Sequence, residues 1–199
     1  YAEKASFANV LCTTSSAAGV IGTSLEPIFD SDHTSVVFSS NVSDDITYTA
    51  DAGTFTFARA GIYHIVLVAN TQQETAHRLH SFAMNLNSAA AFYASVKQVN
   101  TGYDPVESTH QTIVSLSADD VLHIKMLTAG NTATITKGTS VTITEITSGH
   151  YASQQATATG TNTNIDEFNP FDTNYTNNPA SYTTVTAGMT VTATDGSFT

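Results

Sequence analysis

The stretch Asp51–Asn70 constrains the fold more than any other part of this 199-residue chain. Its first half, Gly-Thr-Phe-Thr-Phe, alternates small or hydroxyl residues with Phe55 and Phe57, which is the period-two pattern of a half-buried strand. Its second half, Ile62–Ala69, is almost entirely apolar and rich in β-branched residues, which is typical of a strand buried on both faces. Gly61 lies where the chain must reverse. The stretch therefore predicts two strands joined by a tight turn.

Eight other segments have the length and the alternation of short strands, and none shows a convincing helical period. The clearest is Val121–Leu127, in which Leu122, Ile124 and Met126 share one side. Together the segments predict an all-β chain folded as an antiparallel sandwich. The other seven are Ser35–Ser39, Ile46–Ala50, Arg78–Asn87, Ala91–Val99, Thr109–Ser117, Thr132–Thr136 and Ser140–Ile146.

The composition argues against several classes of function. Only 12% of the residues are charged, and the net charge is −11 with six Lys and Arg residues in all. Because so acidic a chain does not attract a phosphate backbone, we expect no nucleic-acid partner. Cys12 is the single cysteine, which excludes an intrachain disulfide and a cysteine-based zinc site. No apolar run reaches the length of a membrane span.

Six motifs follow one another along the chain: Ile46-Thr-Tyr48, Gly53-Thr-Phe-Thr-Phe57, Ala60-Gly-Ile-Tyr-His-Ile65, Phe82–Leu86, Thr112–Leu127 and Thr139–Ile146. In this order they resemble the tumour necrosis factor (TNF) and complement globular-head superfamily. The last motif departs from the family pattern, because Val141 and Ile143 stand where an aromatic residue and a glycine are usual. The resemblance covers rather more than half of the chain.

The resemblance implies an all-β fold, an antiparallel TNF-like jelly-roll sandwich, with extended N- and C-terminal arms. We accordingly expect an N-terminal arm at residues 1–30, a jelly-roll domain at 31–148 and a C-terminal extension at 149–199. One jelly roll supports many functions, so the resemblance indicates the fold and not the activity.

The resemblance also implies a homotrimer, whose protomers pack flat hydrophobic sheet faces around an axis. Tyr63 occupies the Gly-x-Tyr position of the family, so we expect it at or near the trimer interface, with an ordinary core tyrosine as the alternative. His64 and His123 each lie on a predicted strand, where either could meet its symmetry mates on the threefold axis. The alternative for both is a core or surface histidine.

The two ends of the chain differ in composition from its centre. Residues 1–30 are rich in small residues, and we expect either an extended arm that packs on a neighbour or a flexible leader. The start lacks an initiator Met and a signal-peptide pattern, so we expect a processed or truncated chain. The C-terminal extension is rich in Thr and Asn, but Tyr182–Thr186 and Met189–Thr194 alternate like strands. We expect it to dock on a neighbouring subunit, with a disordered end as the alternative.

The chain carries no recognisable catalytic motif, neither Gly-x-Ser-x-Gly, nor a phosphate-binding glycine loop, nor His-Glu-x-x-His. His77 and His80 are three residues apart, which places them on opposite faces of a strand and unable to hold one ion together. The turn carboxylates of Asp44–Asp45 and Asp119–Asp120 could hold calcium, as in some relatives, or simply be solvated. We expect no catalytic residue, no bound cofactor and no dedicated metal site.

These features leave three classes of function. The first is a structural virion protein, a trimeric capsid decoration, cement or spike-like subunit that binds other particle subunits through its arms. Terminal arms, a neutral Ser/Thr/Asn-rich surface and a jelly roll favour this class. The alternative is a secreted complement-head-like recognition module that binds glycans or proteins, although such modules usually carry disulfides. An enzyme is the third and least favoured class. The virion subunit and the secreted module both imply that the protein is located in the virion or in the extracellular space.

Overall fold

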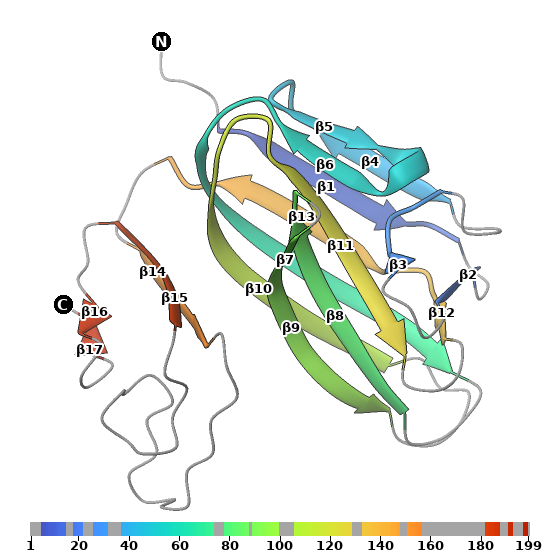
Figure 1. Ribbon diagram of the computed structural model, residues 1–199. Coiled ribbons are helices and arrows are strands. Elements are labelled where there is room, and N and C mark those ends of the chain that lie inside the picture. Colours follow the sequence, from blue (N-terminus) through green and yellow to red (C-terminus); the bar gives the residue numbers. More distant parts are fainter. Residues whose placement is uncertain are drawn as a thin grey trace, which may run out of the picture.

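The computed structural model describes residues 5–14, 18–21, 26–31, 37–73, 78–87, 89–99, 106–128, 133–147, 151–156, 182–187, 191–192 and 197–198. Two antiparallel sheets, one of seven strands and one of six, pack face to face around a single core (Figure 1). The described part of the chain contains no helix that is long and apolar enough to cross a membrane. The expected all-β antiparallel sandwich is confirmed.

The seven-stranded sheet, here called sheet A, has the order β2–β12–β7–β13–β1–β4, and β10 pairs with the other side of β7. Strand β7 is the longest of the structure, and both of its sides are hydrogen-bonded to other strands, which makes it the centre of this sheet. The strands are β1 (Phe7–Cys12), β2 (Ala18–Ile21), β4 (Phe38–Val42), β7 (Gly61–Gln73), β10 (Val106–Leu116), β12 (Ala133–Ile135) and β13 (Ser140–Glu145).

The six-stranded sheet, here called sheet B, has the order β5–β6–β11–β8–β9, and β3 also pairs with β11. A short 3-10 helix, η1 (Ala50–Ala52), joins β5 to β6 and ends at Gly53. Gly53 has φ +59°, and a Cβ atom there would lie 2.9 Å from the backbone nitrogen of Asp30, so the turn requires a glycine. The strands are β3 (Glu26–Pro27), β5 (Ile46–Thr49), β6 (Thr54–Phe57), β8 (Arg78–Leu86), β9 (Ala89–Val99) and β11 (Val121–Thr128).

The two strands predicted within Asp51–Asn70 are present, and they belong to different sheets. Strand β6 lies in sheet B and β7 lies in sheet A, so the turn between them crosses from one layer of the sandwich to the other. The ring centroids of Phe57 and Tyr63 are 4.7 Å apart, one from each layer. The expectation that Ile62–Ala69 is buried on both faces was wrong. Its inward residues are fully buried and its outward residues are half-buried, because nothing among the described residues covers that face completely.

The N-terminal region contributes strands to the sandwich of its own chain. Strand β1 lies between β13 and β4, and its alternate residues Ala8, Val10 and Cys12 are buried. Ile28 and Phe29, which follow β3, also lie in the core. The described part of residues 1–30 is therefore not an arm that packs on a neighbour. Strand β1 carries buried side chains at every second position, and pairing with β13 and β4 on its two sides satisfies its backbone hydrogen bonds. The boundaries at residues 30 and 148 remain predictions.

Beyond residue 147 the structure describes two small strand pairs. Strand β14 (Tyr151–Ala156) pairs with β15 (Tyr182–Ala187), and β16 (Val191–Thr192) pairs with β17 (Ser197–Phe198). The strand expected over Tyr182–Thr186 is thus present, and β14 falls in a low-complexity segment that gains its structure from a distant partner. Strands β14 and β15 lie beside β10, at the left of Figure 1. Docking of this extension on another subunit remains a prediction.

Candidate functional site

The outer face of sheet A combines an apolar stripe with a neutral polar surround. The stripe consists of Ile62, Val66 and Val68 on β7 and Ile113 on β10, all half-buried. These side chains point away from the core, because their neighbours along each strand are the buried ones. The other described outward residues of the face are Thr109, Gln111 and Ser115 on β10, Ser140, Thr142 and Thr144 on β13, Phe7, Asn9 and Leu11 on β1, Ser39 and Asn41 on β4, His64, Asn70 and Gln72 on β7, Thr134 on β12, and Glu107 on β10.

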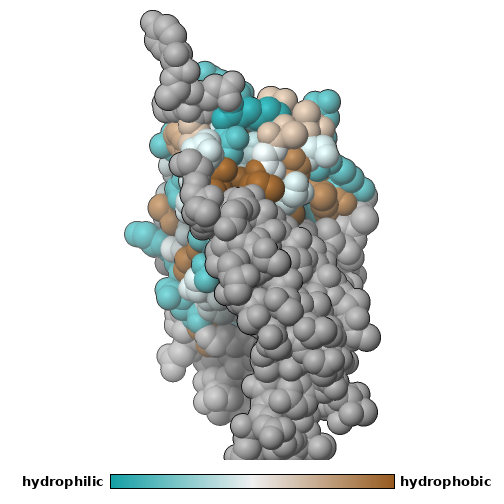
Figure 2. Space-filling view, turned by 90° about the vertical axis from the view of Figure 1, so that its left-hand side faces the viewer, coloured by the Kyte–Doolittle hydropathy of each residue, from teal (hydrophilic) through white to brown (hydrophobic). Residues whose placement is uncertain are grey.

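Charge is nearly absent from this face. Among its described side chains only Glu107 is charged, and it lies at the far end of β10, in register with Asn70. Leu11, which is 38% exposed, is one of two large hydrophobic residues that are well exposed in the described part of the chain. Figure 2 looks at the molecule from the left-hand side of Figure 1 and shows a hydrophobic patch in its upper half, beside hydrophilic surface. A neutral, partly apolar sheet face of this kind is suited to contact with protein.

His64 lies in the middle of the outer face of sheet A. Its cross-strand neighbours are Ile113 on β10 and Thr144 on β13. Its Nε2 atom lies 3.3 Å from Oε1 of Gln111, the next outward residue on β10. The sequence singled out His64 as a candidate interface residue, and the structure places it half-buried on the outer face of sheet A. Its role at an interface stays a prediction.

Tyr63 lies in the core of its own chain, with no exposed surface. Its hydroxyl donates a hydrogen bond to the backbone oxygen of Arg59 at 3.1 Å. Burial raises the pKa of Tyr63, and the nearby carboxylate of Glu145 raises it further. A fully buried ring between two sheets is the ordinary core tyrosine that the sequence left as the alternative. Its place at a trimer interface stays a prediction. Because its side chain is fully buried, Tyr63 contributes no exposed surface to the outer face of sheet A.

A charged cluster closes the sandwich beside Tyr63. The guanidinium of Arg59 forms an ion pair with Glu145, and the Glu145 carboxylate also accepts a 2.9 Å hydrogen bond from the backbone N–H of Ser6. Ser6 in turn donates from its hydroxyl to Asp45 at 3.1 Å. Burial acts to raise the pKa of Glu145, but the bonds from Ser6 and Arg59 outweigh it and hold the pKa below its usual value. The cluster ties the start of β1 to the end of β13, which is a structural role.

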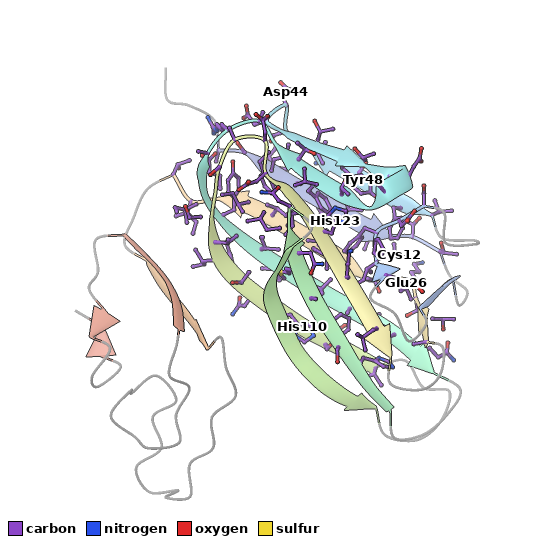
Figure 3. All side chains as sticks on the ribbon, in the orientation of Figure 1. Cys12, Glu26, Asp44, Tyr48, His110 and His123 are labelled. Carbon is purple, nitrogen blue, oxygen red and sulfur yellow. The ribbon has the colours of Figure 1, made fainter. Side chains whose placement is uncertain are left out.

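His123 lies on the opposite side of the molecule from His64. It points outward from β11 in sheet B, because its neighbours Leu122 and Ile124 are in the core (Figure 3). The two candidate histidines therefore cannot share one sheet-face interface. Burial lowers the pKa of His123, and the charge of Lys125 lowers it further. Nδ1 of His123 and Oδ1 of its cross-strand partner Asn85 are both buried without a hydrogen-bond partner.

Two further histidines lie inside the sandwich, and the sequence gave no role to either. His80 on β8 is 1% exposed, and its Nδ1 atom lies 2.9 Å from the hydroxyl of Thr71 on β7. His110 on β10 is nearly buried, and its ring centroid lies 4.7 Å from that of Phe82 (Figure 3). Burial lowers the pKa of His80 to about 4, so this side chain is neutral at pH 7. His77, which precedes His80 by three residues, lies outside the described residues.

The turn carboxylates of Asp45 and Asp120 bind side-chain and backbone groups of neighbouring segments. Asp120 accepts hydrogen bonds from the side-chain amide of Asn87 at 2.6 Å and from the backbone N–H of Ser117 at 2.7 Å. Asp45 lies 4.0 Å from the guanidinium of Arg59, and Asp44 is exposed at the top of Figure 3. In the described part of the chain no three His, Cys, Asp or Glu side chains gather as a group that could hold a metal ion. These contacts indicate a structural role for the carboxylates of Asp45 and Asp120.

Comparison with known proteins bears on the fold. No protein-family model matches the chain, and no curated protein matches it. Among solved structures it is similar to Eiger TNF from S. frugiperda, with a TM-score of 0.53 and 10% identity over 73% of this chain and 96% of that one. Two structures of murine APRIL, at pH 8.5 and pH 5.0, have TM-scores of 0.45 and 0.47 and identities of 13% and 11%, over 72% of this chain and all of theirs.

The fold is therefore that of an antiparallel jelly roll. More particularly it is the TNF-like jelly roll, as the order of motifs from Ile46 to Ile146 led us to expect. At such low identity the likeness concerns the fold alone.

The apolar stripe on the outer face of sheet A was not predicted from the sequence. Val66 and Val68 were assigned to a strand buried on both faces, so they were not considered as surface residues. Ile113 was recognised only as part of a strand. The signal that could have found them is the period-two alternation of β10, where exposed Gln111 and Ser115 flank Ile113 on the same side.

Proposed function

We propose that this protein is a structural subunit of a virus or phage particle, and that it assembles as a homotrimer through the outer face of sheet A. The observation that carries the proposal is the apolar stripe of Ile62, Val66, Val68 and Ile113 on a face with almost no charge. The role within the particle would be capsid decoration, cement or a spike-like element. The site offers protein–protein contact and no catalytic constellation.

Electrostatics favours a second copy of this chain as the occupant of that face. The chain carries a net charge of −11, so two copies repel each other over most of their surfaces. Contact through a neutral face avoids placing like charges opposite one another, which would weaken self-association. Threonine and serine on β10 and β13 surround the stripe and give the interface a polar rim.

Contacts with other particle subunits would come from the C-terminal extension. Its hairpin β14–β15 lies beside β10, an edge strand of sheet A that pairs only with β7 among the described strands. Two-stranded ribbons are marginal by themselves and need a surface to pack on. We therefore expect the extension to bind a neighbouring subunit where one lies next to β10, in a virion or in another extracellular assembly.

A charge placed in the stripe tests the assembly face. We expect Val66→Asp to shift the protein from a trimer to a monomer in sedimentation equilibrium, because three buried carboxylates cannot be accommodated around one axis. Thr47→Asp is the control, since Thr47 is exposed on β5 of the other sheet. Circular dichroism verifies that both variants fold. A wild-type protein that sediments as a monomer would contradict the proposal.

The particle role needs its own experiment. Mass spectrometry of purified particles should detect the chain in stoichiometric amounts if it is a structural subunit. Absence of the chain from particles would reject that role while leaving the trimer intact.

A secreted recognition module is the second candidate. It is favoured by the structural similarity to Eiger TNF, which extends over 96% of that chain. Binding of the isolated protein to a glycan array or to a cell-surface protein would support this candidate, and stoichiometric incorporation into particles would support the first.

A further inference from the structure

We infer that the free edge of β4 joins two copies of this chain, by antiparallel pairing with β4 of the second copy across a twofold axis. Strand β4 lies at one end of sheet A and pairs only with β1 among the described strands. The apolar stripe of the proposed trimer lies on β7 and β10, beyond β1 and β13 in the same sheet. The edge of β4 is therefore a second contact, separate from the stripe.

Three residues of β4 direct their backbone groups away from β1. The backbone N–H of Ser43, just after β4, donates a 2.8 Å hydrogen bond to the backbone oxygen of Phe7 on β1. Backbone groups alternate between the two sides of a strand, and the register of β4 with β1 is unbroken. The N–H and C=O groups of Phe38, Ser40 and Val42 therefore face the open edge, where another strand can add.

These outward groups are self-complementary about Ser40. When Ser40 lies opposite Ser40 of the second copy, Phe38 of each copy lies opposite Val42 of the other. Each of these pairs exchanges both of its backbone hydrogen bonds, so the register uses all of the outward groups. The side chains of Phe38 and Val42 are half-buried and pack against the core, so their cross-strand pair would extend the apolar interior across the junction.

The two large hydrophobic side chains that are well exposed in the described part of the chain lie together at this edge. Val37 is 60% exposed and Leu11 is 38% exposed. Leu11 is in register with Ser39, and the backbone oxygen of Val37 accepts a hydrogen bond from Thr13 at 2.8 Å, so the two side chains are diagonal neighbours on the outer face of sheet A. A second copy paired with β4 would lie directly beside Val37 and withdraw part of this apolar surface from water.

The charge of the edge is compatible with self-association. Residues 37–43 contain no charged residue type, although the chain as a whole has a net charge of −11. The nearest charged residues in the sequence are Asp44 and Asp32, of which Asp32 lies outside the described residues. Antiparallel pairing places the two copies of Asp44 at opposite ends of the joined strands, on the order of 25 Å apart. Their repulsion is screened, because the Debye length is about 8 Å at physiological ionic strength.

The edge contact would connect trimers to one another. A threefold contact through the stripe and a twofold contact through β4 together generate a closed shell or a continuous layer, which goes beyond the proposed trimer. Strand β4 has only five residues, so the contact is small and weak by itself. We therefore expect it at high subunit concentration, or where many copies are held in one assembly.

The test uses the Val66→Asp variant as the parent protein, because this substitution is designed to remove the stripe contact. We expect sedimentation equilibrium to show a monomer at micromolar concentration and a monomer–dimer equilibrium at millimolar concentration. Adding Ser40→Pro removes the central N–H but none of the hydrogen bonds to β1, and we expect the association constant to fall at least tenfold. Ser40→Ala keeps the N–H and is the matched control, which should associate as the parent does.

Ser40→Asp serves if the proline variant folds poorly, because it places two carboxylates directly opposite each other. Equal association of the proline or aspartate variant and the alanine variant would overturn the inference, and so would a parent protein that stays monomeric at millimolar concentration. Wild type that does not form trimers would contradict the proposed function alone, since the edge contact does not use the stripe.

Cysteine cross-linking tests the register. In the twofold pair the Cα atoms of the two Ser40 residues would be about 5.5 Å apart, within the range of a disulfide. Val37→Cys is the control, because the two copies of Val37 would be about 20 Å apart along the strands. Under mild oxidation we expect a disulfide-linked dimer from Ser40→Cys and none from Val37→Cys, with Cys12 buried in both. Equal cross-linking of the two variants would overturn the twofold register.

A strand of the C-terminal extension is the other candidate occupant of the edge. A peptide with the sequence of Tyr182–Ala187 should not bind the parent protein if the edge is reserved for a second β4. Binding of this peptide that is lost in Ser40→Pro, without self-association of the parent, would assign the edge to the extension and overturn the inference.

Discussion

The side chains of Thr71 and His80 join the two sheets across the interior of the sandwich, with Oγ1 and Nδ1 2.9 Å apart. Thr71 comes from β7 in sheet A and His80 from β8 in sheet B, and both are almost completely buried. This buried polar contact makes the stability of the fold sensitive to protonation.

We expect the free energy of unfolding to fall as the pH is lowered from about 6.5 to about 4. The pKa of His80 is lowered to about 4 in the folded protein, against 6.5 in an unfolded chain, so the unfolded chain binds more protons in this window. The expected loss is of the order of 2 kcal/mol. Urea unfolding of wild type and His80→Leu at pH 7.5 and 4.5 measures it. An equal pH dependence in both proteins would contradict the assignment.

Tyr63→Phe should lower the stability of the subunit without changing its state of assembly. The substitution removes the hydroxyl that bonds to the Arg59 backbone oxygen, and the lost hydrogen bond corresponds to about 1 kcal/mol. Thermal unfolding and sedimentation of the variant distinguish the two effects. A change of sedimentation with unaltered stability would instead place Tyr63 at the trimer interface.

Glu145→Gln should destabilise the fold by about 1 to 2 kcal/mol at pH 7, because it weakens the bonds from Ser6 and Arg59. The folded pKa of Glu145 is lowered, so its contribution is present above the usual carboxyl pKa and is lost as the pH falls through the folded value. The difference between wild type and variant in urea unfolding should therefore shrink toward pH 3.

Asp44→Asn is the control for this comparison, since Asp44 is an exposed turn residue. We expect its stability to stay within about 0.5 kcal/mol of wild type. A difference for Glu145→Gln that persists unchanged at pH 3 would show that the effect does not come from the charge of the carboxylate.

Asn85→Leu should raise the free energy of unfolding by about 1 kcal/mol. Oδ1 of Asn85 is buried without a partner, and replacing an unsatisfied polar group by an apolar one of similar shape removes its desolvation cost. Chemical denaturation at pH 7.5 tests this. A marked loss of stability would mean that the amide makes a hydrogen bond in solution, to a water or another group.

Much of the strand assignment could be predicted from residue alternation. The pattern of Leu122, Ile124 and Met126 identified β11 because a strand buried on one face repeats every second residue, whatever its partners are. The same reasoning failed for Val66 and Val68, since an apolar residue on the outward side of a strand has the same sequence signature as one in a core. Sequence alternation indicates two faces and does not say what covers each.

Pairing between distant segments was harder to predict. Strand β1 looked like part of an arm because small residues dominate the segment around it, yet it lies between β13 and β4 and shares five register positions with each. Its place depends on backbone hydrogen bonds to strands more than twenty residues away, and these are independent of side-chain pattern. The same holds for β14, which is strand only because β15 is beside it.

The sequence by itself determined that this chain is all-β, because period two requires only neighbouring residues, and the local motifs around Phe55, Phe57 and Tyr63 carried the resemblance that implied a jelly roll. Only the tertiary structure decided that Phe57 and Tyr63 meet across two different sheets, and that His64 and His123 lie on opposite sides of the sandwich. The physical reason is that burial depends on how the layers are stacked, which is fixed by contacts between residues far apart in the chain.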